Sequence, residues 1–159
     1  RLASGGRYDS DTYGIYTYGG LDQVSNQWPT TALTAGQTIT LDFWATAPHE
    51  PSVWDVWMTT PDWDANTALN WGQMEFLGRP TPVLQDNHYT WDFTVPTDRS
   101  GHHVLWIAWQ RDDPVGEVFF STSDLMITAV PEPSSGFLAG LATMFCVFRR
   151  KRAPAKVRR

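Results

Sequence analysis

Residues 38–46 read TITLDFWAT, and apolar and polar side chains alternate along them. Successive side chains of an extended chain point to opposite faces, so one face collects Ile39, Leu41, Phe43 and Ala45. Strict alternation over this length, with β-branched and aromatic residues, is typical of a β-strand with one buried face. This stretch therefore predicts a strand that packs one side against a core.

Further β-rich stretches follow, the first two of them with the same alternation, and they are separated by Pro, Gly, Asn and Asp, which favour turns. These β-rich stretches are residues 53–60, 89–95, 103–109 and 118–127. No segment keeps a helical period. Spaced strands with turn signals predict an all-β protein, an antiparallel β-sandwich of immunoglobulin or fibronectin III type with long irregular loops. We expect residues 1–34 to be loop, and residues 61–86 to be irregular with a short helical turn.

Composition limits the function. The formal net charge is −5, and seven of the 12 Lys and Arg stand in the last eleven residues, which leaves five beside all 17 acids in the rest. The body is therefore acidic, which argues against a nucleic-acid partner. The single cysteine, Cys146, excludes an intrachain disulfide and zinc-ribbon or redox chemistry. Nine Trp can fill a core or stack on sugar rings. Four of them are expected in the core: Trp54, Trp91, Trp106 and Trp109.

The last 30 residues differ in composition from the rest. Pro131-Glu132-Pro133 is followed by an apolar run at residues 136–148 and then by a basic cluster. This order resembles the PEP-CTERM sorting signal of Gram-negative bacteria, which implies recognition by an exosortase, a transient anchor in the inner membrane and an exported protein of the cell envelope or outside it. We therefore divide the chain into a globular domain, residues 1–129, and a sorting segment, residues 130–159, with a short hydrophobic helix. We expect this segment to pack little against the sandwich.

Common catalytic motifs are absent: the sequence has no Gly-x-Ser-x-Gly, HExxH, Walker or GxGxxG pattern. Asp112, Asp113 and Glu117 leave a glycosidase carboxylate pair open, although solvated loop acids are the simpler interpretation. Among the four histidines, His102 and His103 are adjacent in a strand, so they point to opposite faces and cannot chelate one metal together. His88 follows a turn-like Asp-Asn pair, and we expect it to be solvated. His49 follows Pro48 at a strand end, where functional residues often lie.

Three blocks resemble one family. Residues 43–49 (FWATAPH) with 54–63 (WDVWMTTPDW), residues 95–104 (VPTDRSGHHV) and residues 109–120 (WQRDDPVGEVFF) are similar to the bacterial lytic polysaccharide monooxygenases, also called chitin-binding type-4 domains. That family uses a copper ion, reduced by one electron, to oxidise C–H bonds in crystalline chitin or cellulose. Imidazole nitrogens suit copper, whose Cu(II) state favours tetragonal geometry.

The resemblance implies a role for four residues. The second histidine of the family's copper brace falls on His49, the axial aromatic on Phe119, the acid near the oxygen site on Glu117, and the small residue limiting the other axial face on Ala47. We expect His49 and Phe119 to meet at one end of the sandwich. In the family these residues act on insoluble polysaccharide.

The sequence also departs from the family. The brace uses an amino-terminal histidine, whereas this chain begins Arg1-Leu2-Ala3 and no histidine precedes His49. Thr60 replaces a family lysine, and the family's disulfides and substrate-side motif are missing. We expect the full-length protein to begin with His and the present chain to bind copper weakly. The alternative is a non-catalytic polysaccharide-binding module that has lost the brace, and a weaker third hypothesis is a surface structural or adhesion domain.

Overall fold

A computed structural model describes residues 2–5, 7 and 17–131. Within them the chain forms eight strands and two short 3₁₀ helices. Their bounds, in chain order, are η1 Gly19–Asp22, β1 Thr31–Thr34, β2 Thr38–Trp44, β3 Ser52–Thr59, η2 Trp71–Gln73, β4 Met74–Gly78, β5 Val83–Gln85, β6 His88–Thr94, β7 Gly101–Arg111 and β8 Val118–Thr128.

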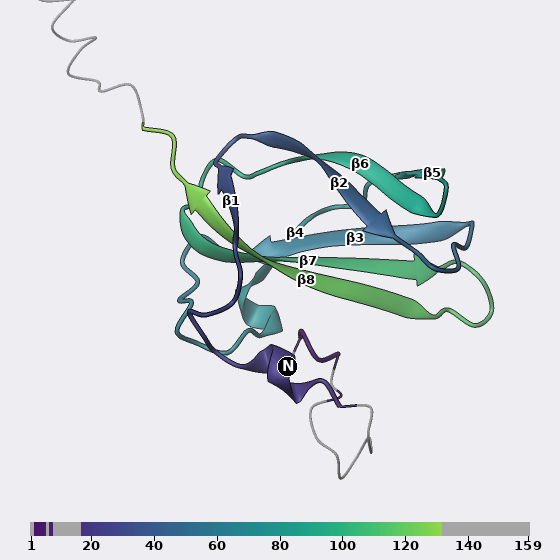
Figure 1. Ribbon diagram of the computed structural model, residues 1–159, viewed down its shortest axis with the longest axis horizontal. Helices are drawn as coiled ribbons and strands as arrows, with labels where there is room; N and C mark the ends of the chain where they lie inside the picture. The colour runs from purple at the N-terminus through teal and green to yellow at the C-terminus, as the bar shows by residue number, and fades with distance from the viewer. Residues whose placement is uncertain (1, 6, 8–16, 132–159) are drawn as a thin grey trace, which may run out of the picture.

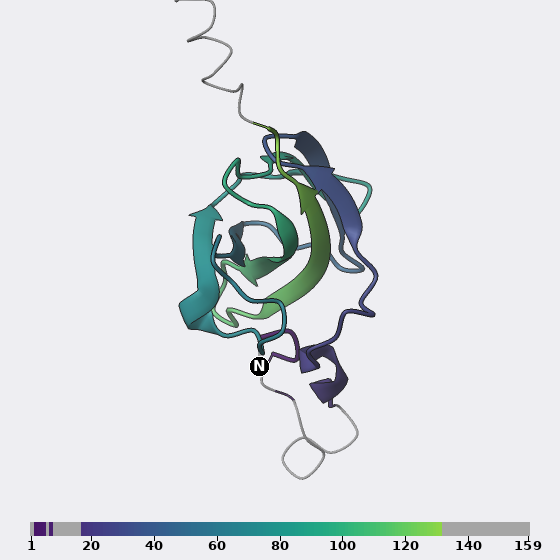
Figure 2. The same cartoon turned by 90° about the vertical axis from the view of Figure 1, so that its left-hand side faces the viewer.

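The strands form two sheets packed face to face (Figure 1). The larger sheet has the order β1-β8-β7-β3-β4 and the smaller one the order β2-β6-β5. All pairs are antiparallel except β1 with β8, which is parallel. Seen along the strands, the sheets curve around the core (Figure 2). The predicted all-β sandwich is confirmed.

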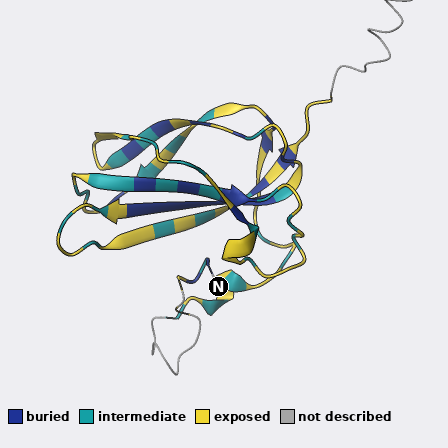
Figure 3. Cartoon of the chain, turned by 180° about the vertical axis from the view of Figure 1, so that it is seen from behind, coloured by how far each residue is buried: buried dark blue, intermediate teal, exposed yellow. Residues whose placement is uncertain are grey.

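Side-chain alternation explains which faces meet. The apolar side chains of β2 and β6 pack against those of β3, β7 and β8. Along β2 and β6, more buried residues alternate with more exposed ones (Figure 3). The main core cluster includes Trp54, Trp91 and Trp109. Trp106 is also buried, but it lies in a second cluster on the outer face of the larger sheet. All four predicted core tryptophans are therefore buried, in two separate clusters.

The N-terminal part covers this outer face. Leu2 is buried against Met74, Trp106 and Ala108. Gly5 has a φ of +59° and lies so near Phe120 that a Cβ would stand 2.1 Å from the phenyl Cζ, so only glycine fits there. Residues 103–109 of β7 are consequently all buried, because both faces of this central strand are covered.

Two loop predictions are partly wrong. Residues 31–34 form β1, although the first 34 residues were expected to be loop. Residues 61–86 contain β4 and β5 as well as the expected helical turn, which is η2. These strands are short or lie at sheet edges, where little burial imposes alternation on the sequence. The proposed C-terminal helix and the packing of the sorting segment lie outside the described residues.

Candidate functional site

His49 stands on the loop between β2 and β3, and a buried tyrosine fixes its backbone. The His49 N–H donates to Tyr89 Oη at 3.0 Å, and the Tyr89 hydroxyl donates to the His49 carbonyl at 2.8 Å. Burial raises the pKa of Tyr89, so the phenol stays protonated and can fill both roles. Sequence reasoning did not identify Tyr89, whose only signal is its place on the buried face of β6.

His49 and Phe119 contact the same ring. His49 stacks on Trp109 with 6.3 Å between ring centroids, and Phe119 stacks on Trp109 at 5.0 Å. Trp109 and Phe119 are direct partners across β7 and β8, which places their side chains on one face. The two side chains therefore lie at one end of the sandwich, as expected, where β7 ends and β8 begins (Figure 1).

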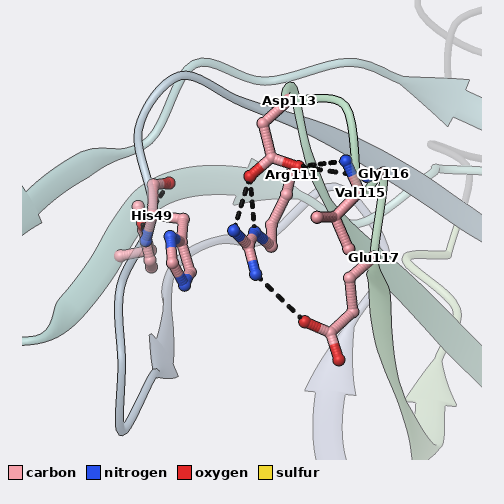
Figure 4. A network of polar contacts seen from close by, with 7 residues as sticks. His49, Arg111, Asp113, Val115, Gly116 and Glu117 are labelled. Carbon is pink, nitrogen blue, oxygen red and sulfur yellow. Dashed lines mark hydrogen bonds and ion pairs between the residues drawn. The ribbon is translucent and has the colours of Figure 1, made fainter.

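Glu117 lies beside this pair in an ion-pair network (Figure 4). Arg111 donates from Nη1 to Glu117 at 3.3 Å and also pairs with Asp113, with Nη2 at 2.6 Å from the carboxylate. The Arg111 side chain is one-fifth exposed and the Glu117 side chain about half exposed. Sequence reasoning missed Arg111, which links the predicted acid to the β7–β8 loop.

The β7–β8 loop uses Asp113 as a structural group. Its Oδ1 accepts the N–H groups of Val115 at 2.9 Å and Gly116 at 3.1 Å. The hydrogen bond from Gly116, together with Arg111, lowers the pKa of Asp113. The Asp112 N–H donates to the Pro51 carbonyl at 3.0 Å, which joins this loop to the loop carrying His49. Asp113 thus fixes a turn and is tied to Arg111, so it is poorly placed to act as a glycosidase acid.

Ala47 and the N-terminal part complete the surroundings. Ala47 is exposed, two residues before His49 in the same loop. Glu117, Phe119 and Phe120 line a pocket of about 540 Å³ together with Arg7 and Tyr18. Residues far apart in sequence, including the region before β1, therefore reach the same end.

The other histidines lie elsewhere. His102 pairs with Asp124 at 2.6 Å, whereas His103 points inward and contacts Thr59 Oγ1 at 2.9 Å. The prediction that the two cannot share a metal agrees with this arrangement. The His88 side chain is 44% exposed and pairs with Asp42.

A copper brace needs several nitrogen ligands, and the donor set here is incomplete. The described residues contain no group of three or more His, Cys, Asp or Glu that could hold a metal ion. His49 alone offers an imidazole beside Phe119 and Glu117. These residues fit one side of such a site.

Two protein-family models match parts of this chain. The family model described as "Lytic polysaccharide mono-oxygenase, cellulose-degrading" matches residues 1–125, and a model of the PEP-CTERM protein-sorting motif matches residues 129–152. A "Lytic cellulose monooxygenase" of Streptomyces ambofaciens is 33% identical over 118 residues, covering 70% of this chain and 32% of the relative. "Chitin-binding protein CbpD" of Pseudomonas aeruginosa is 28% identical, covering 72% of this chain and 31% of the relative.

A solved structure of a "cellulose active LPMO", CelS2, in complex with copper matches with a TM-score of 0.64 and 29% identity, covering 73% of this chain and 62% of that chain. A fusolin from Wiseana entomopoxvirus matches with a TM-score of 0.60 and the same identity, covering 72% and 46%. The present chain spans about a third of the length of the two curated relatives named above, from Streptomyces ambofaciens and Pseudomonas aeruginosa.

Proposed function

Since this chain belongs to the lytic polysaccharide mono-oxygenase family, we propose that the protein cleaves crystalline polysaccharide by copper-dependent oxidation. The single observation that carries this proposal is the meeting of His49 and Phe119 on Trp109, with Glu117 beside them. The three residues to which the family resemblance assigned a role from sequence alone, His49, Phe119 and Glu117, lie close together in space.

Each residue has a proposed role. His49 would hold copper through one imidazole, and the amino-terminal histidine that the family's brace uses would supply the other nitrogens. Bound copper would supply the one-electron chemistry. Phe119 and Ala47 would border the bound ion and limit what reaches it, and Glu117, held by Arg111, would offer a hydrogen-bond acceptor beside it.

We propose chitin or cellulose as the substrate. The printed names of relatives include a cellulose monooxygenase, a chitin-binding protein and, from Enterococcus faecalis, a chitin monooxygenase. Both polymers present flat sugar faces, which suit the aromatic-rich composition of this chain.

The sorting motif and the family together point to an exported protein. We propose further that an exosortase recognises Pro131-Glu132-Pro133 and that the following apolar run anchors the protein transiently in the inner membrane. Among the described residues, no helix is long and apolar enough to cross a membrane.

Copper calorimetry tests the proposal. A full-length form beginning with His should bind Cu(II) tightly, and the present chain only weakly, because one terminal residue contributes both its amine and its ring. In that full-length form His49→Ala should abolish release of oxidised oligosaccharides. His102→Gln is the matched control, because His102 pairs with Asp124 away from Trp109.

A non-catalytic polysaccharide-binding module is the second candidate, favoured by the single imidazole at the described site. Equal, weak copper binding by both forms, with no oxidised products, would rule out the enzyme and leave this module.

A further inference from the structure

Trp44 has no structural partner in the part of the chain that the structure describes. It is 61% exposed, and no ring contact or side-chain hydrogen bond joins it to another described residue. Every other tryptophan has one or the other: even Trp28 donates its indole N–H to the Gln23 carbonyl at 2.9 Å. An unpartnered, exposed indole is a large apolar surface that folding leaves in water, and such rings are enriched where proteins bind ligands.

Its position is next to the proposed site. Trp44 is the last residue of β2, five residues before His49. Its neighbour Phe43 points the other way, into the core, with its ring 5.0 Å from Trp54 and 6.2 Å from Trp109. Trp109 is the ring that His49 and Phe119 share. Trp44 therefore lies on the outer face of the smaller sheet, at the end that carries His49 (Figure 1).

Two polar side chains share that face. The register pairs Trp44 with His88, and His88 with Gln85, so the three residues form one row across β2, β6 and β5. Asp42 binds His88 Nδ1 at 2.7 Å, which orients the imidazole and leaves Nε2 as its other hydrogen-bonding atom. Gln85 is exposed and carries a planar amide.

This combination has the chemistry of a sugar site. A pyranose ring offers an apolar C–H face, which stacks on an indole, and hydroxyl groups at its edge, which pair with amide and imidazole groups. We propose that Trp44, His88 and Gln85 form a subsite that binds a sugar unit of the polysaccharide next to the His49 end of the sandwich. The identity of the ligand rests on the proposed function, whereas the role of the row as a binding surface does not need copper.

The test compares two tryptophans of similar exposure. Trp71 is 52% exposed, but it belongs to η2 and packs on the larger sheet. Its ring centroid lies 5.4 Å from that of Trp57 and 5.1 Å from that of Trp106. Binding of the full chain to insoluble chitin and to insoluble cellulose is measured by depletion isotherms, together with Tm. Trp44→Ala should weaken binding about tenfold, which equals about 1.4 kcal/mol, and leave Tm unchanged. Trp71→Ala should leave binding unchanged and lower Tm.

Conservative variants separate stacking from shape. Trp44→Phe should retain most of the affinity, and Gln85→Ala should lose about twofold to threefold, since a single exposed hydrogen bond contributes little. Wild-type affinity in Trp44→Ala, or equal weakening by Trp44→Ala and Trp71→Ala, would overturn the proposal. No binding of the unaltered chain to either polymer would also overturn it. Loss of binding in Trp44→Ala, together with equal and weak copper binding by the present chain and by the form beginning with His, would support the subsite while contradicting the enzyme.

Discussion

At the scale of single residues, His103 shows how burial selects a protonation state. The Ser100 carbonyl can only accept a hydrogen bond, so His103 donates to it from Nε2–H at 3.2 Å. In the neutral ring Nδ1 is then an acceptor and receives the Thr59 O–H at 2.9 Å, while Thr59 Oγ1 accepts the Val104 N–H at 3.1 Å. The neutral ring therefore satisfies all of these hydrogen bonds. A second proton, on Nδ1, would point at the Thr59 O–H, which is itself the donor in this pair.

Acid should therefore destabilise the fold through His103. Burial is the largest cause that lowers its pKa, and the nearby Arg99 adds to it. Above pH about 6.5 the ring is neutral in both the folded and the unfolded chain. As the pH falls below that value the unfolded chain takes up a proton first, so the free energy of unfolding decreases until the folded pKa is reached, by about 1.4 kcal/mol for each unit of pKa difference.

Urea unfolding of His103→Gln and of the unaltered chain, at pH 7.5, 6 and 5, measures this contribution. The variant should lose less stability between pH 7.5 and 5 than the unaltered chain. His88→Gln, which removes a partly exposed histidine, is the control and should show the same loss of stability in acid as the unaltered chain. An identical pH slope in His103→Gln would show that the buried ring is not the cause.

At the scale of elements, strands were predictable where β-branched and aromatic residues are concentrated, either in alternation with polar residues, as in β2, or in a continuous buried run, as in β7. The five predicted strands correspond to β2, β3, β6, β7 and β8. The missed strand β5 has no buried residue, and β1 has only Leu33. β1 depends on pairing with β8, which lies about 90 residues further along the sequence. β5 depends on pairing with β6, which carries the stronger strand pattern. Local sequence does not contain that information.

The β5–β6 hairpin gives a prediction at this scale. Its two-residue turn has φ of +49° at Asp86 and +67° at Asn87, the signs of a type I′ turn. Asparagine tolerates this region and a β-branched residue does not. Asn87→Val should therefore lower the free energy of unfolding by about 1–2 kcal/mol, whereas Asn87→Gly should leave it unchanged or raise it slightly. Chemical denaturation measures both. The Ala45 N–H donates to the Asn87 carbonyl at 2.9 Å, and this hydrogen bond involves only backbone, so both variants should keep it. Equal stabilities of Asn87→Val and the unaltered chain would contradict the turn assignment.

At the scale of the whole molecule, the candidate site is assembled from distant segments. The β2–β3 loop brings His49, β7 brings Trp109 and Arg111, and β8 brings Phe119. Composition and periodicity placed these residues on strands or loops but could not bring them together, and the family resemblance supplied the grouping. Tyr89 and Arg111 were missed because their roles depend on three-dimensional neighbours: a backbone 40 residues away for Tyr89 and a carboxylate across a turn for Arg111.

The boundary between the sandwich and the sorting segment is the last prediction. Thr128, at the end of β8, still accepts the Ala35 N–H at 2.9 Å, and β8 contributes Leu125 and Ile127 to the core. Val130 and Pro131 are exposed.

Truncation after Ala129 should therefore leave Tm unchanged within about 2 °C, since surface changes rarely exceed about 0.5 kcal/mol. Truncation after Asp124 removes two buried side chains and the whole register with β1, so this control should fail to fold. Thermal melts of both forms decide the point: a large loss of Tm on truncation after Ala129 would mean that the sorting segment stabilises the sandwich and that the proposed domain boundary at residue 129 is wrong.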